Sequence, residues 1–101
     1  MIEPAKLRDY LLSSTHPVGR FKAAFFQALG YSADDWQTLE ADLLELARAQ
    51  EAVVGQVSPY GTKYEMHATL TGPNGRTAGI VAVWILRNDE DFPRFVTAYP
   101  D

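Results

Sequence analysis

The chain has 101 residues, a hydrophobic share of 47% and a net charge of −4, so it has apolar surface for one core and the wrong overall sign for binding nucleic acid through its total field. It contains no cysteine, which excludes disulfides and thiolate zinc sites and fits a cytoplasmic setting. No apolar run approaches the length of a membrane span, and residues 1–15 lack the features of a signal peptide. We therefore expect one globular cytoplasmic domain over residues 1–101, with no membrane association.

The first half of the chain repeats apolar residues at helical spacing. Leu7, Tyr10 and Leu11 predict a helix over residues 4–13, and Pro4 is tolerated in its first turn. A turn, STHPVG, separates it from a second predicted helix over residues 19–29, which Gly30 closes. The predicted inward face of this second helix consists of Phe21, Ala24, Phe25 and Leu29.

A third helix is predicted over residues 33–49. Ser32 is placed to cap its start, Asp35 occupies the acidic position of a capping box, and Tyr31 is placed to pack against Trp36. Its predicted buried stripe consists of Trp36, Leu39, Leu43, Leu46 and Ala47.

After Glu51 the apolar period changes from helical to alternating, which predicts strands. Residues 77–86 are apolar on both sides, so we expect this strand to be central and covered on each face. The predicted fold is α+β, with three N-terminal helices followed by a four-stranded antiparallel sheet and the helices packed on one sheet face. The predicted strands cover residues 52–57, 63–70, 77–86 and 94–100, and in the second of them Tyr64, Met66, Ala68 and Leu70 point inward.

The segment STHPVGRFK contains three residues suited to binding or cleaving a phosphate ester. His16 lies in a turn and has an ordinary pKa that suits proton transfer near neutral pH. Arg20 and Lys22 lie in the first turns of the following helix, whose free amides also favour an anion. The alternative is structural: a loop histidine that hydrogen-bonds the turn, and two cations on a solvated helix flank.

The predicted hairpin SPYGTKY offers a second group of candidates. An exposed Tyr60 is suited to stacking a nucleic-acid base, and Lys63 to binding its backbone. The alternative is an ordinary hairpin tip.

The closing strand, RFVTAYP, contributes Thr97 and Arg94. Alternation places Thr97 on the same face as Phe95 and Tyr99, where its hydroxyl either binds a phosphate oxygen or simply packs. The chain has no glycine-rich phosphate loop, no histidine pair at metal spacing and no Ser or Cys nucleophile motif, so we expect neither a metal nor a cofactor.

Four segments together resemble an uncharacterised bacterial domain family: HPVGRFKAAFF, PYGTKYE, GPNGRTAGIVAVW and FVTAYP. This family occurs both as small free-standing proteins and at the C-terminal ends of large secreted polymorphic toxins. Its order of helices and strands resembles the barnase, EndoU, colicin and RelE group of metal-independent ribonucleases. In that group a histidine or basic residue of the helical part meets a hydroxyl or basic residue of the last strand.

The resemblance implies cleavage of RNA by attack of a ribose 2′-OH on the adjacent phosphorus, with His16 helping to deprotonate it. It also implies RNA and a cognate immunity or antitoxin protein as partners. The competing hypothesis is a non-catalytic protein-binding module of the same fold, whose acidic third helix meets a basic surface. The implied catalytic residues are His16, Lys22 and Thr97, and the implied substrate-binding residues are Arg20, Tyr60, Lys63 and Arg94.

Overall fold

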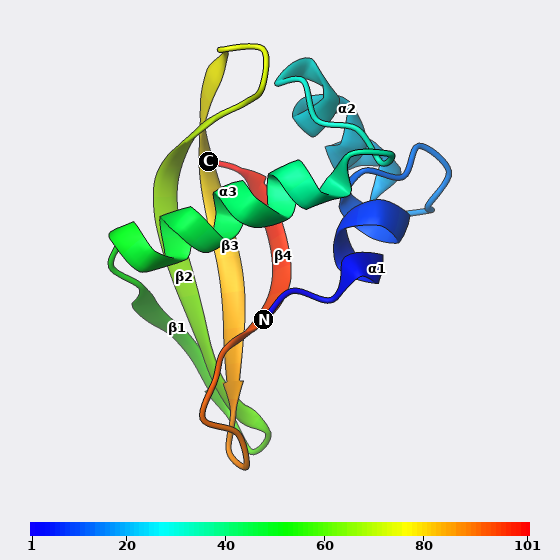
Figure 1. The fold of residues 1–101 in the computed structure, drawn as a ribbon. Coiled ribbons are helices and arrows are strands. Elements are labelled where there is room, and N and C mark those ends of the chain that lie inside the picture. The colour runs from blue at the N-terminus through cyan, green and yellow to red at the C-terminus, as the bar shows by residue number, and fades with distance from the viewer.

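The helices precede the strands along the chain, as the sequence predicts. The computed structural model describes residues 1–101 (Figure 1). Its elements in chain order are α1 (Pro4–Lys6), the π-helical turn η1 (Leu7–Leu11), α2 (Arg20–Ala28), α3 (Trp36–Ala49), β1 (Val53–Ser58), β2 (Gly61–Thr71), β3 (Thr77–Arg87) and β4 (Arg94–Pro100).

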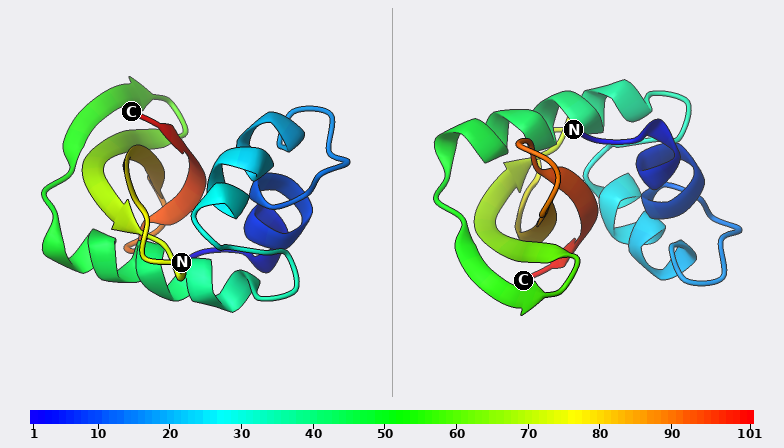
Figure 2. Two further views of the ribbon diagram at one scale, coloured as in Figure 1. Left: turned by 90° about the horizontal axis from the view of Figure 1, so that it is seen from above. Right: turned by 90° about the horizontal axis from the view of Figure 1, so that it is seen from below.

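The four strands form one antiparallel sheet in the order β1-β2-β3-β4, so each strand pairs with its neighbour in the chain. Helix α3 crosses one face of the sheet, while α1, η1 and α2 stand beside β4 (Figures 1 and 2). This arrangement confirms the predicted α+β class. None of the helices combines the length and the apolar character that a membrane crossing requires.

The core lies between the helices and the sheet face that α3 crosses. Pairing of Tyr64 with Trp84 and of Met66 with Ala82 places these side chains on this face, as the alternation in β2 predicts. Leu39 and Leu43 of α3 and Phe26 of α2 are fully buried against it. The core cluster contains Ile2, Leu7, Leu11, Leu12, Phe26, Leu29, Tyr31, Leu39, Leu43, Met66, Leu70, Ile80, Ala82, Trp84, Phe95 and Ala98.

The predicted first helix is shorter than expected and partly π-helical. The amide of Leu12 donates to the carbonyl of Leu7 at 2.8 Å, which closes a wider turn than an α-helix has. The wider turn lets Leu7, Leu11 and Leu12 all be buried. The helical structure therefore ends at Leu11 and does not continue to residue 13.

The predicted inward face of the second helix is confirmed at Leu29, which is buried, and at Phe25, which packs partly buried against the core, but it is wrong at Phe21 and Ala24. Phe21 is 72% exposed, and the buried residues are Ala23, Phe26 and Leu29. A close contact explains the rotation, because a Cβ atom on Gly19 would lie 2.0 Å from the carbonyl oxygen of Tyr10. This approach of α2 to η1 sets which side of the helix meets the core.

The start of α3 has half of the predicted capping box. The Ser32 hydroxyl accepts a hydrogen bond from the Asp35 amide at 3.3 Å, but the Asp35 side chain makes no capping bond in return. The helix accordingly begins at Trp36 and not at residue 33. Leu39 and Leu43 of the predicted stripe are buried, whereas Ala47 is exposed.

The sheet face opposite α3 has no helix on it, which differs from the expected cover on both faces of β3. Val81 and Val83 of β3 are nevertheless buried there, at 3% and 9% exposure. Their neighbours across the strand pairs supply the cover: Glu65 and His67 on β2, and Thr97 and Tyr99 on β4. Polar side chains therefore border an apolar strip on this open face.

A β-bulge in β4 corrects the predicted direction of Thr97. Phe95 pairs with Trp84 and Thr97 pairs with Val83, which leaves Val96 as an extra residue between them. Phe95 consequently faces the core, whereas Thr97 faces the open side of the sheet together with Tyr99. The prediction that Phe95 and Thr97 share one face is wrong, because simple alternation does not survive the extra residue.

Candidate functional site

Three polar side chains from distant segments meet where the helices border β4. The ammonium group of Lys22 on α2 donates to the phenol oxygen of Tyr10 on η1 at 2.6 Å and to the hydroxyl of Thr97 on β4 at 3.2 Å. The Tyr10 and Thr97 oxygens lie 3.4 Å apart. We call these three residues the Tyr10 cluster. Its members are partly buried, so their interactions are less weakened by water than those of an exposed pair.

The Tyr10 phenol is the member with a shifted pKa. Burial opposes its ionisation, but the hydrogen bonds from Lys22 and with Thr97, together with the positive charges of Lys22 and Lys6, outweigh burial and lower the pKa of Tyr10 below its usual value. A phenol with a lowered pKa is ionised in a larger fraction of the molecules at a given pH, so the form that can accept a proton is more often present. The environment therefore prepares Tyr10 for proton transfer.

His16 lies against this cluster and also caps α2. Its Nδ1 atom accepts hydrogen bonds from the amides of Val18 and Gly19, at 3.0 and 2.9 Å. Its ring meets the Tyr10 ring edge to face, with centroids 5.0 Å apart. Because Nδ1 acts as an acceptor, the proton of the neutral ring is on Nε2, which makes Nε2 a hydrogen-bond donor.

A hollow of about 460 Å³ opens beside the cluster. A second hollow, of about 500 Å³, shares Val96 and Thr97 with the first and contains Lys63 and Glu65. The two hollows therefore border each other at Val96 and Thr97. The first hollow is lined by Lys6, Tyr10, His16, Val18, Val96 and Thr97.

The hollows continue to the β1–β2 hairpin. A third hollow, of about 220 Å³, shares Gln56 and Lys63 with the second and reaches Tyr60 at the hairpin tip. The three neighbouring hollows follow one another along the open face of the sheet, from the Tyr10 cluster to Tyr60, and we call this row of hollows the groove. Glu65 is the only acidic residue that lines this groove, although the chain as a whole is acidic.

The sequence and the fold were compared with those of known proteins. The family model described as a domain of unknown function, DUF6883, matches residues 1–101. The chain belongs to the DUF6883 family. No curated protein sequence matches it.

One solved structure shares the fold of this DUF6883 domain. It is a chain of a contact-dependent growth inhibition toxin–immunity protein complex from Klebsiella pneumoniae 342, with a TM-score of 0.76 and 18% sequence identity. The match covers 99% of the DUF6883 chain and 98% of that chain. At this identity the likeness establishes a common fold.

The sequence implies seven candidate site residues in this DUF6883 chain. Five of them line the groove or belong to the Tyr10 cluster, and the other two, Arg94 and Arg20, do neither. The guanidinium of Arg94 is held by Glu90 at 2.6 Å and by Glu3 at 3.4 Å. Arg20 is exposed and lies over the Phe21 ring, 4.8 Å from its centroid, outside the residues that line the groove. His16, Lys22, Thr97, Tyr60 and Lys63 are the five.

Sequence reasoning missed Tyr10, Lys6 and Glu65. Tyr10 was counted as an apolar residue of the first helix, although a tyrosine beside buried leucines keeps a hydroxyl that needs a polar partner. Glu65 lies on the open face of β2 and lines the second hollow together with Lys63. The signal that marks it is its spacing from Lys63, since residues two apart on a strand share a face.

Proposed function

We propose that this domain is a toxin-type endoribonuclease that cleaves RNA through attack of the ribose 2′-OH and needs no metal ion, because the nucleophile belongs to the substrate. The observation that carries the proposal is the Tyr10 cluster: a phenol with a lowered pKa, a lysine at 2.6 Å and a threonine hydroxyl, at one end of an open groove. The likeness in fold to a chain of a toxin–immunity complex supports it.

The cluster provides a closed path for the protons of this reaction. Ionised Tyr10 takes the proton of the 2′-OH, and the 2′-oxygen forms a bond to phosphorus while the bond to the 5′-oxygen breaks. The ammonium group of Lys22 gives a proton to the departing 5′-oxygen. The new phenol proton then passes along the 2.6 Å hydrogen bond to Lys22, which restores both groups.

His16 and Thr97 position groups in this scheme. Because Nδ1 of His16 already accepts from two amides of the turn before α2, we assign its Nε2–H as a donor to a phosphoryl oxygen and give the role of base to Tyr10. Thr97 holds the Lys22 ammonium at 3.2 Å, and this contact limits where Lys22 can deliver its proton.

The remainder of the groove fits a single strand of RNA. Lys6 and Lys63 lie along it and are suited to pairing with phosphates, and Tyr60, which is 80% exposed at the far end, is suited to stacking a base. The net charge of −4 disfavours RNA binding through the overall field, but Lys6 and Lys63 provide positive charge at the groove itself. Because the free enzyme would damage the cell that makes it, we also propose a cognate immunity protein and cytoplasmic action.

The test is a cleavage assay on a labelled single-stranded RNA in the presence of EDTA, with detection of 2′,3′-cyclic phosphate ends. Lys22→Met is expected to slow cleavage by about a hundredfold or more, since it removes the proton donor. Arg48→Met is the matched control, because it removes the same charge from an exposed site on α3. Absence of cleavage by the wild-type chain, or equal rates for Lys22→Met and wild type, would contradict the proposal and favour the non-catalytic protein-binding module.

A further inference from the structure

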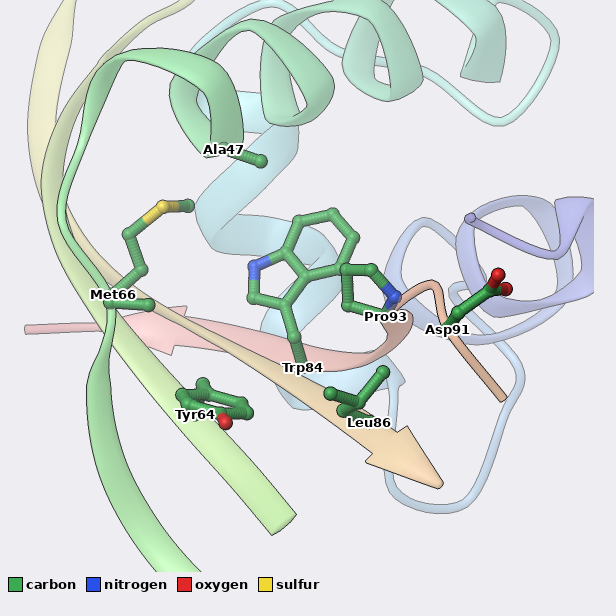
Figure 3. A pocket seen from close by; sticks show the side chains of 8 residues that line it. Ala47, Tyr64, Met66, Trp84, Leu86, Asp91 and Pro93 are labelled. Atoms are coloured by element: carbon green, nitrogen blue, oxygen red, sulfur yellow. The ribbon is translucent and has the colours of Figure 1, made fainter. Parts of the chain in front are cut away.

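A separate hollow lies on the opposite face of the sheet, below the C-terminal end of α3 (Figure 3). Its volume is about 260 Å³, and most of its lining is hydrophobic. Pockets for drug-sized ligands measure roughly 300–1,000 Å³, so this one suits a group the size of a single side chain. The lining residues include Ala47, Ala52, Met66, Trp84 and Asp91.

The hollow exists because α3 ends in small residues over an uncovered part of the sheet. Leu39 and Leu43 fill the space between α3 and the sheet, but Ala47 offers only a methyl group at the next inward position. Figure 3 shows this methyl directed toward the Trp84 ring across the hollow. A larger residue at position 47 would fill the space.

Trp84 contains the only buried side-chain nitrogen or oxygen atom in the structure that has no hydrogen-bond partner, its indole Nε1. Trp84 is 5% exposed, and Figure 3 shows the indole nitrogen on the ring edge turned toward Met66. A buried N–H without an acceptor costs about 1–3 kcal/mol, so a native structure rarely leaves one unpaired. Met66 is a flexible wall, and its displacement by an entering group would bring an acceptor to this N–H.

The surroundings of the hollow specify the charge and polarity of its occupant. Asp91 lines it, and Glu51 directly precedes the lining residue Ala52. The Arg94 guanidinium lies over the neighbouring Phe92 ring, 5.2 Å from its centroid, but it is paired with both Glu90 and Glu3, so the acids leave the rim with negative charge. Val54 and Phe92, at 56% and 40% exposure, continue the apolar surface beside it. An apolar hollow with an exposed apolar border is typical of a pocket that anchors one residue of a protein partner.

We propose that this hollow binds one apolar residue of a protein partner, flanked by basic residues, whose backbone carbonyl accepts a hydrogen bond from Trp84 Nε1. The groove described above lies on the other face of the sheet, so a partner bound here leaves the groove open. The proposal therefore stands whether or not the domain cleaves RNA.

Three short peptides test the proposal on the whole domain: Ac-Lys-Leu-Lys-NH2, Ac-Glu-Leu-Glu-NH2 and Ac-Lys-Ser-Lys-NH2. The indole N–H resonance of Trp84, distinguished from that of Trp36 with Trp36→Phe, reports binding. We expect the first peptide to shift this resonance saturably at concentrations up to about 10 mM. The second is expected to bind about tenfold more weakly because of the acidic rim, and the third to cause no shift.

Ala47→Leu is the blocking variant, and it keeps the fold because leucine is a good helix former at this exposed position. It should abolish the shift while its thermal unfolding stays close to that of the wild type. No shift with the first peptide, or an equal shift in Ala47→Leu, would overturn the proposed pocket. Equal binding of the first two peptides would overturn the proposed basic flanks, and equal binding of the third would overturn the apolar anchor.

Discussion

The ammonium nitrogen of Lys22 lies 3.2 Å from the hydroxyl oxygen of Thr97, although 75 residues separate the two in the chain. Lys22 belongs to a helix that stands beside β4, and Thr97 belongs to β4 itself. The hydrogen bond depends on the docking of the N-terminal helices onto the edge of the sheet. Because the same segments also contribute Leu7, Leu11 and Phe26 to the core, a change that loosens this docking affects the Tyr10 cluster and the core together.

Tyr10→Phe separates catalysis from folding. It removes the phenol oxygen and keeps the ring that packs against His16 at 5.0 Å, so the domain should remain folded by circular dichroism. The rate of cyclic-phosphate formation should fall by about a hundredfold or more, which is the usual contribution of a positioned base. Tyr99→Phe serves as the control, since Tyr99 lies on the same strand as Thr97 and is outside the cluster. A rate for Tyr10→Phe close to that of Tyr99→Phe would rule out the assigned base.

The lowered pKa of Tyr10 is directly measurable by ultraviolet titration of the folded domain. One of its tyrosines should ionise below the ordinary value of 10.0, and Tyr10→Phe should lose this early transition. Because the ionised form is favoured in the folded state, the contribution of Tyr10 to stability appears as the pH rises through its folded pKa and is complete above pH 10.0. The cleavage rate should also rise with pH over this window. A first tyrosine transition at or above the ordinary value would contradict the account.

Substitutions of His16 distinguish its capping role from a role in cleavage. His16→Ala removes the acceptor for the Val18 and Gly19 amides and should lower the free energy of unfolding by about 1 kcal/mol, as loss of a helix cap does. His16→Asn keeps a side-chain acceptor and should recover most of this loss in chemical denaturation. If Nε2–H also binds phosphate, cleavage by His16→Asn should stay reduced. Equal stability of His16→Ala and the wild type would show that the cap contributes nothing.

Tyr31 supports the contact of α3 with the sheet. Its hydroxyl donates its one proton to the Asp42 carboxylate at 2.6 Å, and the Thr71 carbonyl oxygen lies near the same proton, 3.3 Å from the phenol oxygen. Tyr31→Phe should therefore lower the free energy of unfolding by about 2 kcal/mol, the usual range for a hydrogen bond to a charged group. Tyr60→Phe, at an 80% exposed position, should have no such effect in the same denaturation experiment.

The contribution of the Tyr31 hydroxyl to the free energy of unfolding also depends on pH. Burial, followed by the hydrogen bond to Asp42 and its negative charge, raises the pKa of Tyr31 well above its ordinary value of 10.0. Because the pKa of Tyr31 is higher in the folded than in the unfolded chain, its contribution to stability is complete below pH 10.0 and is lost as the pH rises beyond that value. The stability difference between wild type and Tyr31→Phe should therefore narrow in alkaline solution. A constant difference across this range would contradict the assigned pKa shift.

The elements that the sequence predicts well are those whose apolar period is long and uninterrupted. Residues 77–86 are apolar throughout and form the central strand β3, within Thr77–Arg87. The stripe containing Leu39 and Leu43 is buried in α3, where the 3.6-residue period continues over several turns. The spacing of apolar residues along a regular helix or strand follows the side that is buried, and these predictions are confirmed for that reason.

The errors arise where a contact between distant segments overrides the local pattern. The rotation of α2 depends on the approach of Gly19 to the Tyr10 carbonyl, which no period within residues 19–29 reveals. Arg94 reads as a free cation in the sequence, but Glu90 and Glu3 hold it. The predicted meeting of Lys22 with Thr97 is confirmed by their hydrogen bond, while the catalytic roles of both remain predictions.

The extra residue Val96 determines which side chains of β4 face the interior and which face the exterior. Because it offsets the alternation, Phe95 and Ala98 serve the interior while Val96 and Thr97 border the hollows on the exterior. Substitutions of the outward residues Val96 and Thr97 can therefore change the exterior of this strand without repacking the interior. Deletion of Val96 would leave Phe95, Thr97 and Ala98 in regular alternation on their present sides and would remove only the extra residue, which lines two of the hollows.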